Sequence, residues 1–140
     1  MAANTTPIFS ATPAIGLSDA TPILTANTTT DLTAGTIYLL FTADATDGSY
    51  IDKIIIQPIG TNVATAGRLW INNGATTGTA TNNTQFKDFT LAATTVSQVV
   101  AIGNTEVTLG FALPAGYRIY MTLGTTVAAG FKSTVVAGNY

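Results

Sequence analysis

The feature that most restricts the fold of this chain is a series of short β-compatible segments separated by clusters of turn-forming residues. The segments are rich in threonine, valine and isoleucine, whose branched side chains fit a pleated sheet, while the breaks carry Gly, Asn and Asp, which tolerate tight turns. This spacing is typical of an antiparallel sandwich or barrel, and no segment has helical periodicity. The predicted strands cover residues 23–26, 37–43, 50–59, 67–72, 84–92, 96–102, 106–113, 117–123 and 131–137.

Two of these segments alternate cleanly between apolar and other residues. In residues 106–113 and 117–123 every second side chain is large and apolar, so one face of each strand should point into a core. The sequence Leu113-Pro114-Ala115-Gly116 lies between them and matches a type I turn, with Pro at the second position and Gly at the fourth. We therefore expect the two strands to form a hairpin.

Two other segments, residues 37–41 and 54–56, are apolar on both faces. A strand covered on one side only could not keep such a sequence in water, so the second face must also be covered. A central position in a sandwich or a subunit interface would both provide that cover. Residues 76–83 are polar and small, and we expect them to form a surface loop.

Residues 1–21 are predicted to be an extended N-terminal arm, ahead of a single β-sandwich domain at residues 22–140. Prolines at positions 7, 13 and 22 favour extended backbone. The arm is either a frayed terminus or a contact segment whose apolar side chains occupy a groove on a neighbour. The candidate contact residues are Ile8, Phe9, Ile15 and Leu17. The first residues lack the basic segment and apolar core of a secretory signal, so we expect synthesis in a cytoplasm.

Charge is unusually sparse, since only 9% of the residues are charged and the net charge is -2. The five cations are scattered singly along the chain, whereas nucleic-acid binding needs several cations that converge on phosphates. Nucleic acid is therefore an unlikely class of partner. No apolar run is long enough for a transmembrane helix, so we expect no membrane partner either.

The chain contains no histidine and no cysteine. Ser-His-Asp and Cys-His catalysis, His-ligated metals and zinc-thiolate sites are therefore excluded. The seven acidic residues show no pairing that marks a glycosidase, and the acidic turn at residues 44–49 lacks the alternating ligands of a calcium loop. Trp70 has apolar neighbours at alternate positions, which favours a core residue over a sugar platform. We expect no enzyme activity, no metal and no cofactor.

Three stretches resemble a family of small structural proteins of tailed bacteriophages. Residues 51–60, with the sequence IDKIIIQPIG, and residues 67–74, with the sequence GRLWINNG, are similar to the central strands of that family. The stretch from Leu113-Pro114-Ala115-Gly116-Tyr117 to the terminal Gly138-Asn139-Tyr140 resembles its closing hairpin and C-terminus. The resemblance covers residues 21–140. It implies a jelly roll in the virion, several members being trimeric decoration (cement) proteins on the capsid surface.

Three functions remain open at this point. The first, which the resemblance favours, is a homotrimer that binds the major capsid protein and stabilises the shell, with Ile8, Phe9, Ile15 and Leu17 as capsid or subunit contacts. The second is a fibre-tip or receptor-binding module that contacts a glycan, because jelly rolls also serve in that role. A carbohydrate-processing enzyme ranks below both, because no acid pair identifies an active site.

Overall fold

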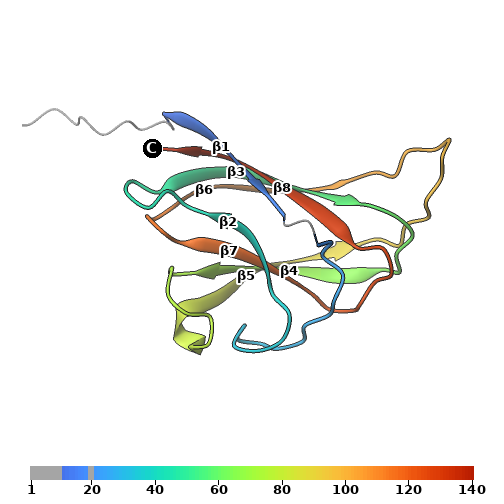
Figure 1. Ribbon diagram of the computed structural model, residues 1–140, viewed down its shortest axis with the longest axis horizontal. Helices are drawn as coiled ribbons and strands as arrows, with labels where there is room; N and C mark the ends of the chain where they lie inside the picture. The colour runs from blue at the N-terminus through green and yellow to red at the C-terminus, as the bar shows by residue number, and fades with distance from the viewer. Residues whose placement is uncertain (1–10, 19–20) are drawn as a thin grey trace, which may run out of the picture.

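The computed structural model describes residues 11–18 and 21–140, and these residues fold into two four-stranded antiparallel sheets packed against each other (Figure 1). The first sheet has the order β1-β8-β3-β6 and consists of Thr12–Leu17, Phe131–Asn139, Ser49–Pro58 and Thr105–Leu113. The second has the order β2-β7-β4-β5 and consists of Tyr38–Thr42, Arg118–Leu123, Thr65–Asn72 and Asn83–Leu91. The described residues contain no α-helix, only a short 3₁₀ turn, η1, at Ala80–Asn82. The predicted all-β antiparallel sandwich is confirmed.

The connections between strands mostly run from one sheet to the other. Only β4 and β5 follow each other within one sheet, while every other pair of successive strands is divided between the two sheets. The hairpin predicted from residues 106–113 and 117–123 is therefore wrong, because β6 pairs with β3 and β7 pairs with β2 and β4. Alternation within each strand identified its buried face correctly, but it carries no information about which strand lies beside it.

The turn between β6 and β7 is also shifted by one residue from the predicted position. The Tyr117 N–H donates to the Pro114 carbonyl oxygen at 3.2 Å, so Pro114 is the first residue of the turn. Gly116 is then the third residue and has a φ of 74°. A positive φ at the third position is the type II pattern, which glycine adopts without steric cost.

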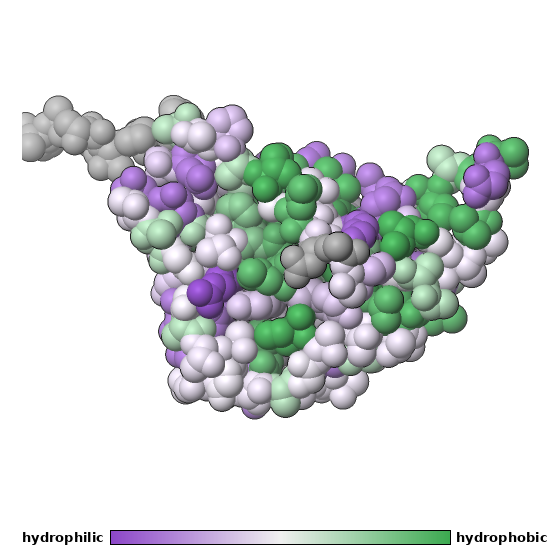
Figure 2. All heavy atoms as spheres, viewed as in Figure 1, coloured by the Kyte–Doolittle hydropathy of each residue, from purple (hydrophilic) through white to green (hydrophobic). Residues whose placement is uncertain are grey.

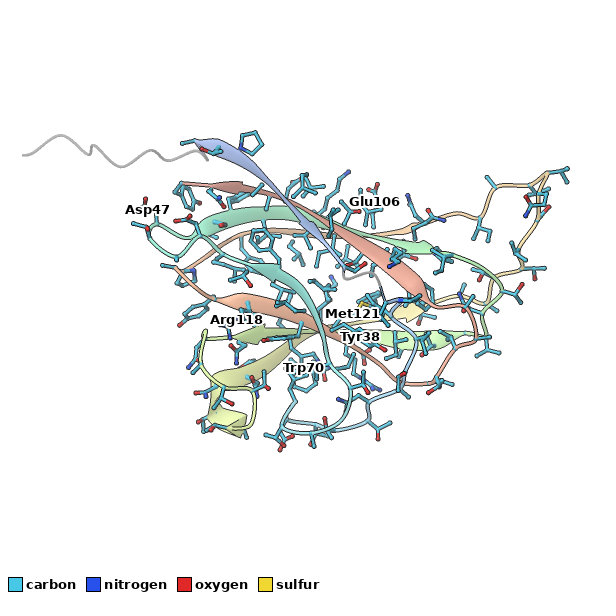
Figure 3. All side chains as sticks on the ribbon, in the orientation of Figure 1. Tyr38, Asp47, Trp70, Glu106, Arg118 and Met121 are labelled. Atoms are coloured by element: carbon cyan, nitrogen blue, oxygen red, sulfur yellow. The ribbon has the colours of Figure 1, made fainter. Side chains whose placement is uncertain are left out.

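The core lies between the sheets and is built from alternate side chains of their strands. Ile54 and Ile56 of β3 and Ile119 and Met121 of β7 belong to one buried cluster, and all four are fully buried. Met121 lies between the two sheets (Figure 3). The sides of the sandwich are closed by contacts between edge strands. On one side the rings of Phe86 and Phe111 pack edge to face, with centroids 5.7 Å apart.

The outer face of the second sheet is covered by the segment that precedes β2. Leu32 and Ile37 from that segment pack on Trp70 and Tyr120 (Figure 3). Trp70 is only 1% exposed, and its Nε1–H donates to the Thr122 Oγ1 at 3.0 Å. The interpretation of Trp70 as a core residue is confirmed. Within residues 37–41, Ile37 is thus partly covered by its own chain, whereas Leu39 of β2 remains 41% exposed.

Leu32 has an unusual backbone for a large residue, since its φ is 64°. Positive φ costs a residue with a Cβ roughly 1–2 kcal/mol. The buried position of its side chain over Trp70 offsets that cost.

Two predicted strands are absent, and one predicted loop is present. Residues 23–26 were predicted to be a strand, but they make only isolated bridges, from Ile23 to Phe131 and from Ala26 to Leu123. Residues 76–83 form the expected surface loop, and the amide of Asn83 fixes it by donating to the Thr77 carbonyl oxygen at 2.8 Å. The predicted strand at residues 96–102 is described with the candidate site.

Candidate functional site

The predicted contact residues Ile15 and Leu17 lie on β1, an edge strand of the first sheet. Residues 12–17 are extended, as expected for the arm, but they pair along their full length with β8 of the same chain. The sheet therefore begins at residue 12, inside the range predicted as an arm. The other two predicted contacts, Ile8 and Phe9, lie outside the described residues.

Ile15 and Leu17 point away from the core and are 58% and 70% exposed. Across the ladder, Ile15 is opposite Val136 and Leu17 is opposite Thr134 of β8. Thr134 is in turn opposite Ile55 of β3. Directly opposed residues of an antiparallel pair share one face, so these side chains form one surface. We call Ile15, Leu17, Ile55 and Val136 the β1–β8 patch.

The patch is bordered on the β6 side by an ion pair. Lys53, opposite Val136, lies 3.5 Å from the carboxylate of Glu106, which is opposite Ile55 (Figure 3). Both side chains are partly exposed, so the pair contributes at most about 1 kcal/mol to stability. Its charges nevertheless neutralise each other next to the apolar surface.

A second apolar surface lies at the end of the loop that joins β5 to β6. Residues 92–104 project beyond one end of the sandwich (Figure 1), and apolar side chains gather at the far end of the projection (Figure 2). Val99 is 91% exposed and Val100 66%, with Val96 also exposed. The loop contains no charged residue. We call Val96, Val99 and Val100 the apolar tip.

The predicted strand at residues 96–102 is wrong, because these residues have no ladder partner in the described chain. Their valines and isoleucine favour extended backbone, but a strand also needs a neighbour with free backbone groups. Sequence reasoning took the segment as a sandwich strand and so missed it as an interaction site. The available signal was a long uncharged stretch with valines and no alternation of apolar and polar residues.

The base of the projecting loop is held rigidly by Asn62, which is only 3% exposed. Its Oδ1 accepts the N–H groups of Ala129 and Gly130 at 2.9 and 2.8 Å, and its Nδ2 donates to the Gly130 carbonyl oxygen at 3.1 Å. The main chain of Asn62 also exchanges two hydrogen bonds with Thr94. Three separate loops are thereby fixed at one point, and the apolar tip extends from it.

In the acidic turn after β2, the carboxylate of Asp44 accepts hydrogen bonds from the main chain of the turn itself. The Oδ1 of Asp44 accepts the N–H groups of Asp47 and Thr46 at 3.0 and 2.9 Å. These two bonds, from Asp47 first and then Thr46, lower the pKa of Asp44 below its ordinary value. Across the described ranges, no three side chains of the metal-binding types gather in one place.

These surfaces can bind other apolar surfaces, and they carry no grouping of acids and bases. Exposed apolar patches on a small domain mark sites of association with other molecules. The described part of the chain has no helix with the length and apolar character needed to cross a bilayer. No known protein family, curated protein or solved structure matches the chain.

Proposed function

We propose that the chain is a non-enzymatic structural protein of a bacteriophage virion, a decoration protein that binds the outside of the capsid and stabilises the shell. The observation that carries the proposal is the pair of exposed apolar surfaces, the β1–β8 patch and the apolar tip, on a sandwich whose core is otherwise closed. Such surfaces on a domain with few charges are suited to association with other protein subunits.

The order of the strands supports a jelly roll. A jelly roll has eight strands in two four-stranded sheets, with Greek-key connections that cross between the sheets. The orders β1-β8-β3-β6 and β2-β7-β4-β5 fit that scheme, because all connections except β4 to β5 cross. This fold is shared by many unrelated proteins, so it supports the sequence resemblance without deciding the function.

The proposed partners are the major capsid protein and two further copies of the chain in a homotrimer. A protein that binds only the assembled shell stabilises it by mass action, and many weakly held copies act together. The low charge of the chain fits this role, because the attachment then depends little on salt.

The alternative, a fibre tip that binds a glycan, has less support. The most suitable stacking residue, Trp70, is enclosed beneath Leu32 and cannot reach a sugar. A glycan site would also need several polar side chains around an exposed ring. No observation on the described residues favours it.

The direct test is a cryo-EM map of the virion encoded by the same genome. We expect density for the eight-stranded sandwich on the outer capsid surface. Adding the purified protein to particles stripped of it should raise the temperature at which they release DNA. Density at the tail or baseplate, or no effect on stripped particles, would contradict the proposal.

A further inference from the structure

Among residues 11–18 and 21–140, two exposed apolar surfaces differ in shape, since one lies on a projecting loop and the other on a sheet face. The apolar tip is a projecting loop, and the β1–β8 patch lies on the outer face of the first sheet (Figures 1 and 2). The hydrogen bonds of Asn62 fix the base of the loop at the end of the sandwich, so the tip points away from the molecule that carries it. Within one molecule the apolar tip does not cover the β1–β8 patch, so both surfaces are exposed.

We propose that these surfaces cover each other between copies, with the apolar tip of one copy packed on the β1–β8 patch of the next. The contact is head-to-tail, and it joins two different surfaces of the same chain. This contact would join the copies of the homotrimer in the proposed function, on which the inference rests. The contact itself does not require a capsid.

The charges on both sides fit this contact. Residues 92–104 contain no charged side chain, so the tip brings no charge into an apolar interface. Around the patch, β1 is also uncharged, and the nearest ion pair, Lys53 with Glu106, is already neutralised within its own sheet. Lys132 of β8 lies on the same face, opposite Gln57 of β3, and with the Lys53–Glu106 pair it would lie at the rim of the contact, where charged groups lie in other protein interfaces.

The area of one contact explains why a closed ring is expected. A large aliphatic side chain presents roughly 60–120 Å² of apolar surface, so the exposed parts of Ile15, Leu17 and the three valines amount to roughly 200–400 Å². This sum covers both partners of the contact, and a stable pair of proteins buries about 1,600 Å² over both partners together. One contact is therefore too small for a lasting dimer. In a ring each copy makes two contacts, and both must break before it leaves.

The test uses two acidic substitutions at the most exposed position of each surface, Val99→Asp on the tip and Leu17→Asp on the patch. Because both side chains are largely in solvent, the variants should fold, and circular dichroism with thermal unfolding checks this. The control is Ala115→Asp, which adds the same charge at an exposed turn between β6 and β7.

Light scattering then gives the mass of each protein at about 50 µM, a concentration that saturates a contact of micromolar affinity. We expect trimers for the unmodified chain and for the control, and monomers of 14.4 kDa for each acidic variant. An equal mixture of the two variants should show an average mass that rises with concentration from the monomer towards the dimer and never reaches the trimer. The intact tip of one variant still fits the intact patch of the other, but this single small contact holds the pair weakly and the ring cannot close. The chain with both substitutions should be monomeric.

Each departure from this pattern overturns the inference. A monomeric unmodified chain removes the contact altogether. An assembly that resists either acidic substitution shows that the surface in question is not used. A mixture whose mass does not rise above that of the separate variants at any concentration shows that the tip and the patch do not bind each other. If the trimer behaves as expected and the virion map lacks the protein, the proposed function fails while the contact stands.

Discussion

Replacing Asn62 with alanine should destabilise the sandwich more than the loss of any other single hydrogen-bonding side chain at the tip's base. The amide accepts two main-chain N–H groups, from Ala129 and Gly130, and donates to the Gly130 carbonyl oxygen at 3.1 Å. A weaker donation reaches the Gly60 carbonyl oxygen at 3.4 Å. Alanine satisfies none of these groups.

The size of the effect follows from burial. Asn62 is 3% exposed, so its partners are also removed from bulk water. A buried group left without a partner costs about 1–3 kcal/mol, and water that enters the space left by the amide recovers part of this. We therefore expect a loss of about 3 kcal/mol. For a domain of this size that corresponds to a fall in Tm of roughly 6–12 °C.

The assay is equilibrium urea unfolding, followed by tryptophan fluorescence from Trp70. It is best made in the Val99→Asp background, because assembly would otherwise add a concentration-dependent stabilisation. Thr94→Val is the graded comparison. It removes one bond, from the Thr94 hydroxyl to the Gly60 carbonyl oxygen at 2.8 Å, and should cost about 1 kcal/mol.

The reasoning is refuted if Asn62→Ala unfolds within about 0.5 kcal/mol of its parent, since the amide would then be replaceable by water. It is also refuted if Thr94→Val proves the more damaging change. Hydrogen exchange at the Thr94 and Val96 amides gives an independent measure, because both should lose protection when the base of the loop loosens.

Three further outcomes are expected. Leu32→Ala and Leu32→Gly remove the same packing on Trp70, each at about 2–4 kcal/mol, but urea unfolding should find the glycine variant the more stable because φ is positive there. Hydrogen bonds from the Thr33 N–H and hydroxyl lower the pKa of Asp31 below 3.8, and those from the Asp47 and Thr46 N–H groups do the same for Asp44. The ionised carboxylates therefore stabilise the fold above pH 3.8, and this stabilisation is lost as the pH falls through the lowered pKa values. With no histidine in the chain, the urea midpoint should stay constant between about pH 5 and 8, and a midpoint that moves in that range contradicts the assignment. Deleting residues 1–20 removes β1 and should cost at least about 2 kcal/mol in urea unfolding, whereas deleting residues 1–10 keeps every strand, and equal stabilities would show that β1 adds nothing.

The strands that could be predicted from sequence are those in which the order of apolar and polar residues indicates which face is buried. Alternation in residues 106–113 located β6, and the apolar run at residues 54–56 located the centre of β3. Trp70 was assigned to the core from its apolar neighbours. In each case the signal is local, because burial of one face depends on the period of the strand itself.

Pairing between strands could not be predicted in the same way. Residues 12–17 contain Pro13, which favours extended backbone, and their composition is like that of a free terminus. They nevertheless pair with β8 at the other end of the chain. The same side-chain pattern serves a hairpin and a crossing between sheets, so β6 and β7 were wrongly joined.

The contact role of Ile15 and Leu17 stays a prediction, and the structure adds only their position and exposure. Ile15 and Leu17 were chosen because a solvated tail has little use for large apolar residues, and both are exposed on β1. The apolar tip was missed for the opposite reason. Val99 and Val100 have high strand propensity, and propensity alone does not reveal whether a partner strand is present.

The position of β8 between β1 and β3 affects how the protein forms during synthesis. β8 is the last of the eight strands to leave the ribosome, yet it joins the first strand to the rest of its sheet. At about 5–20 residues per second, β1 is in solution for several seconds before its partner exists. During that time the main-chain N–H and C=O groups of residues 12–17 lack the ladder partner that β8 later provides, and they can pair with other nascent chains on the same messenger RNA. Such an arrangement favours assembly among copies made together, and it makes the rate of translation a variable in the yield of folded protein.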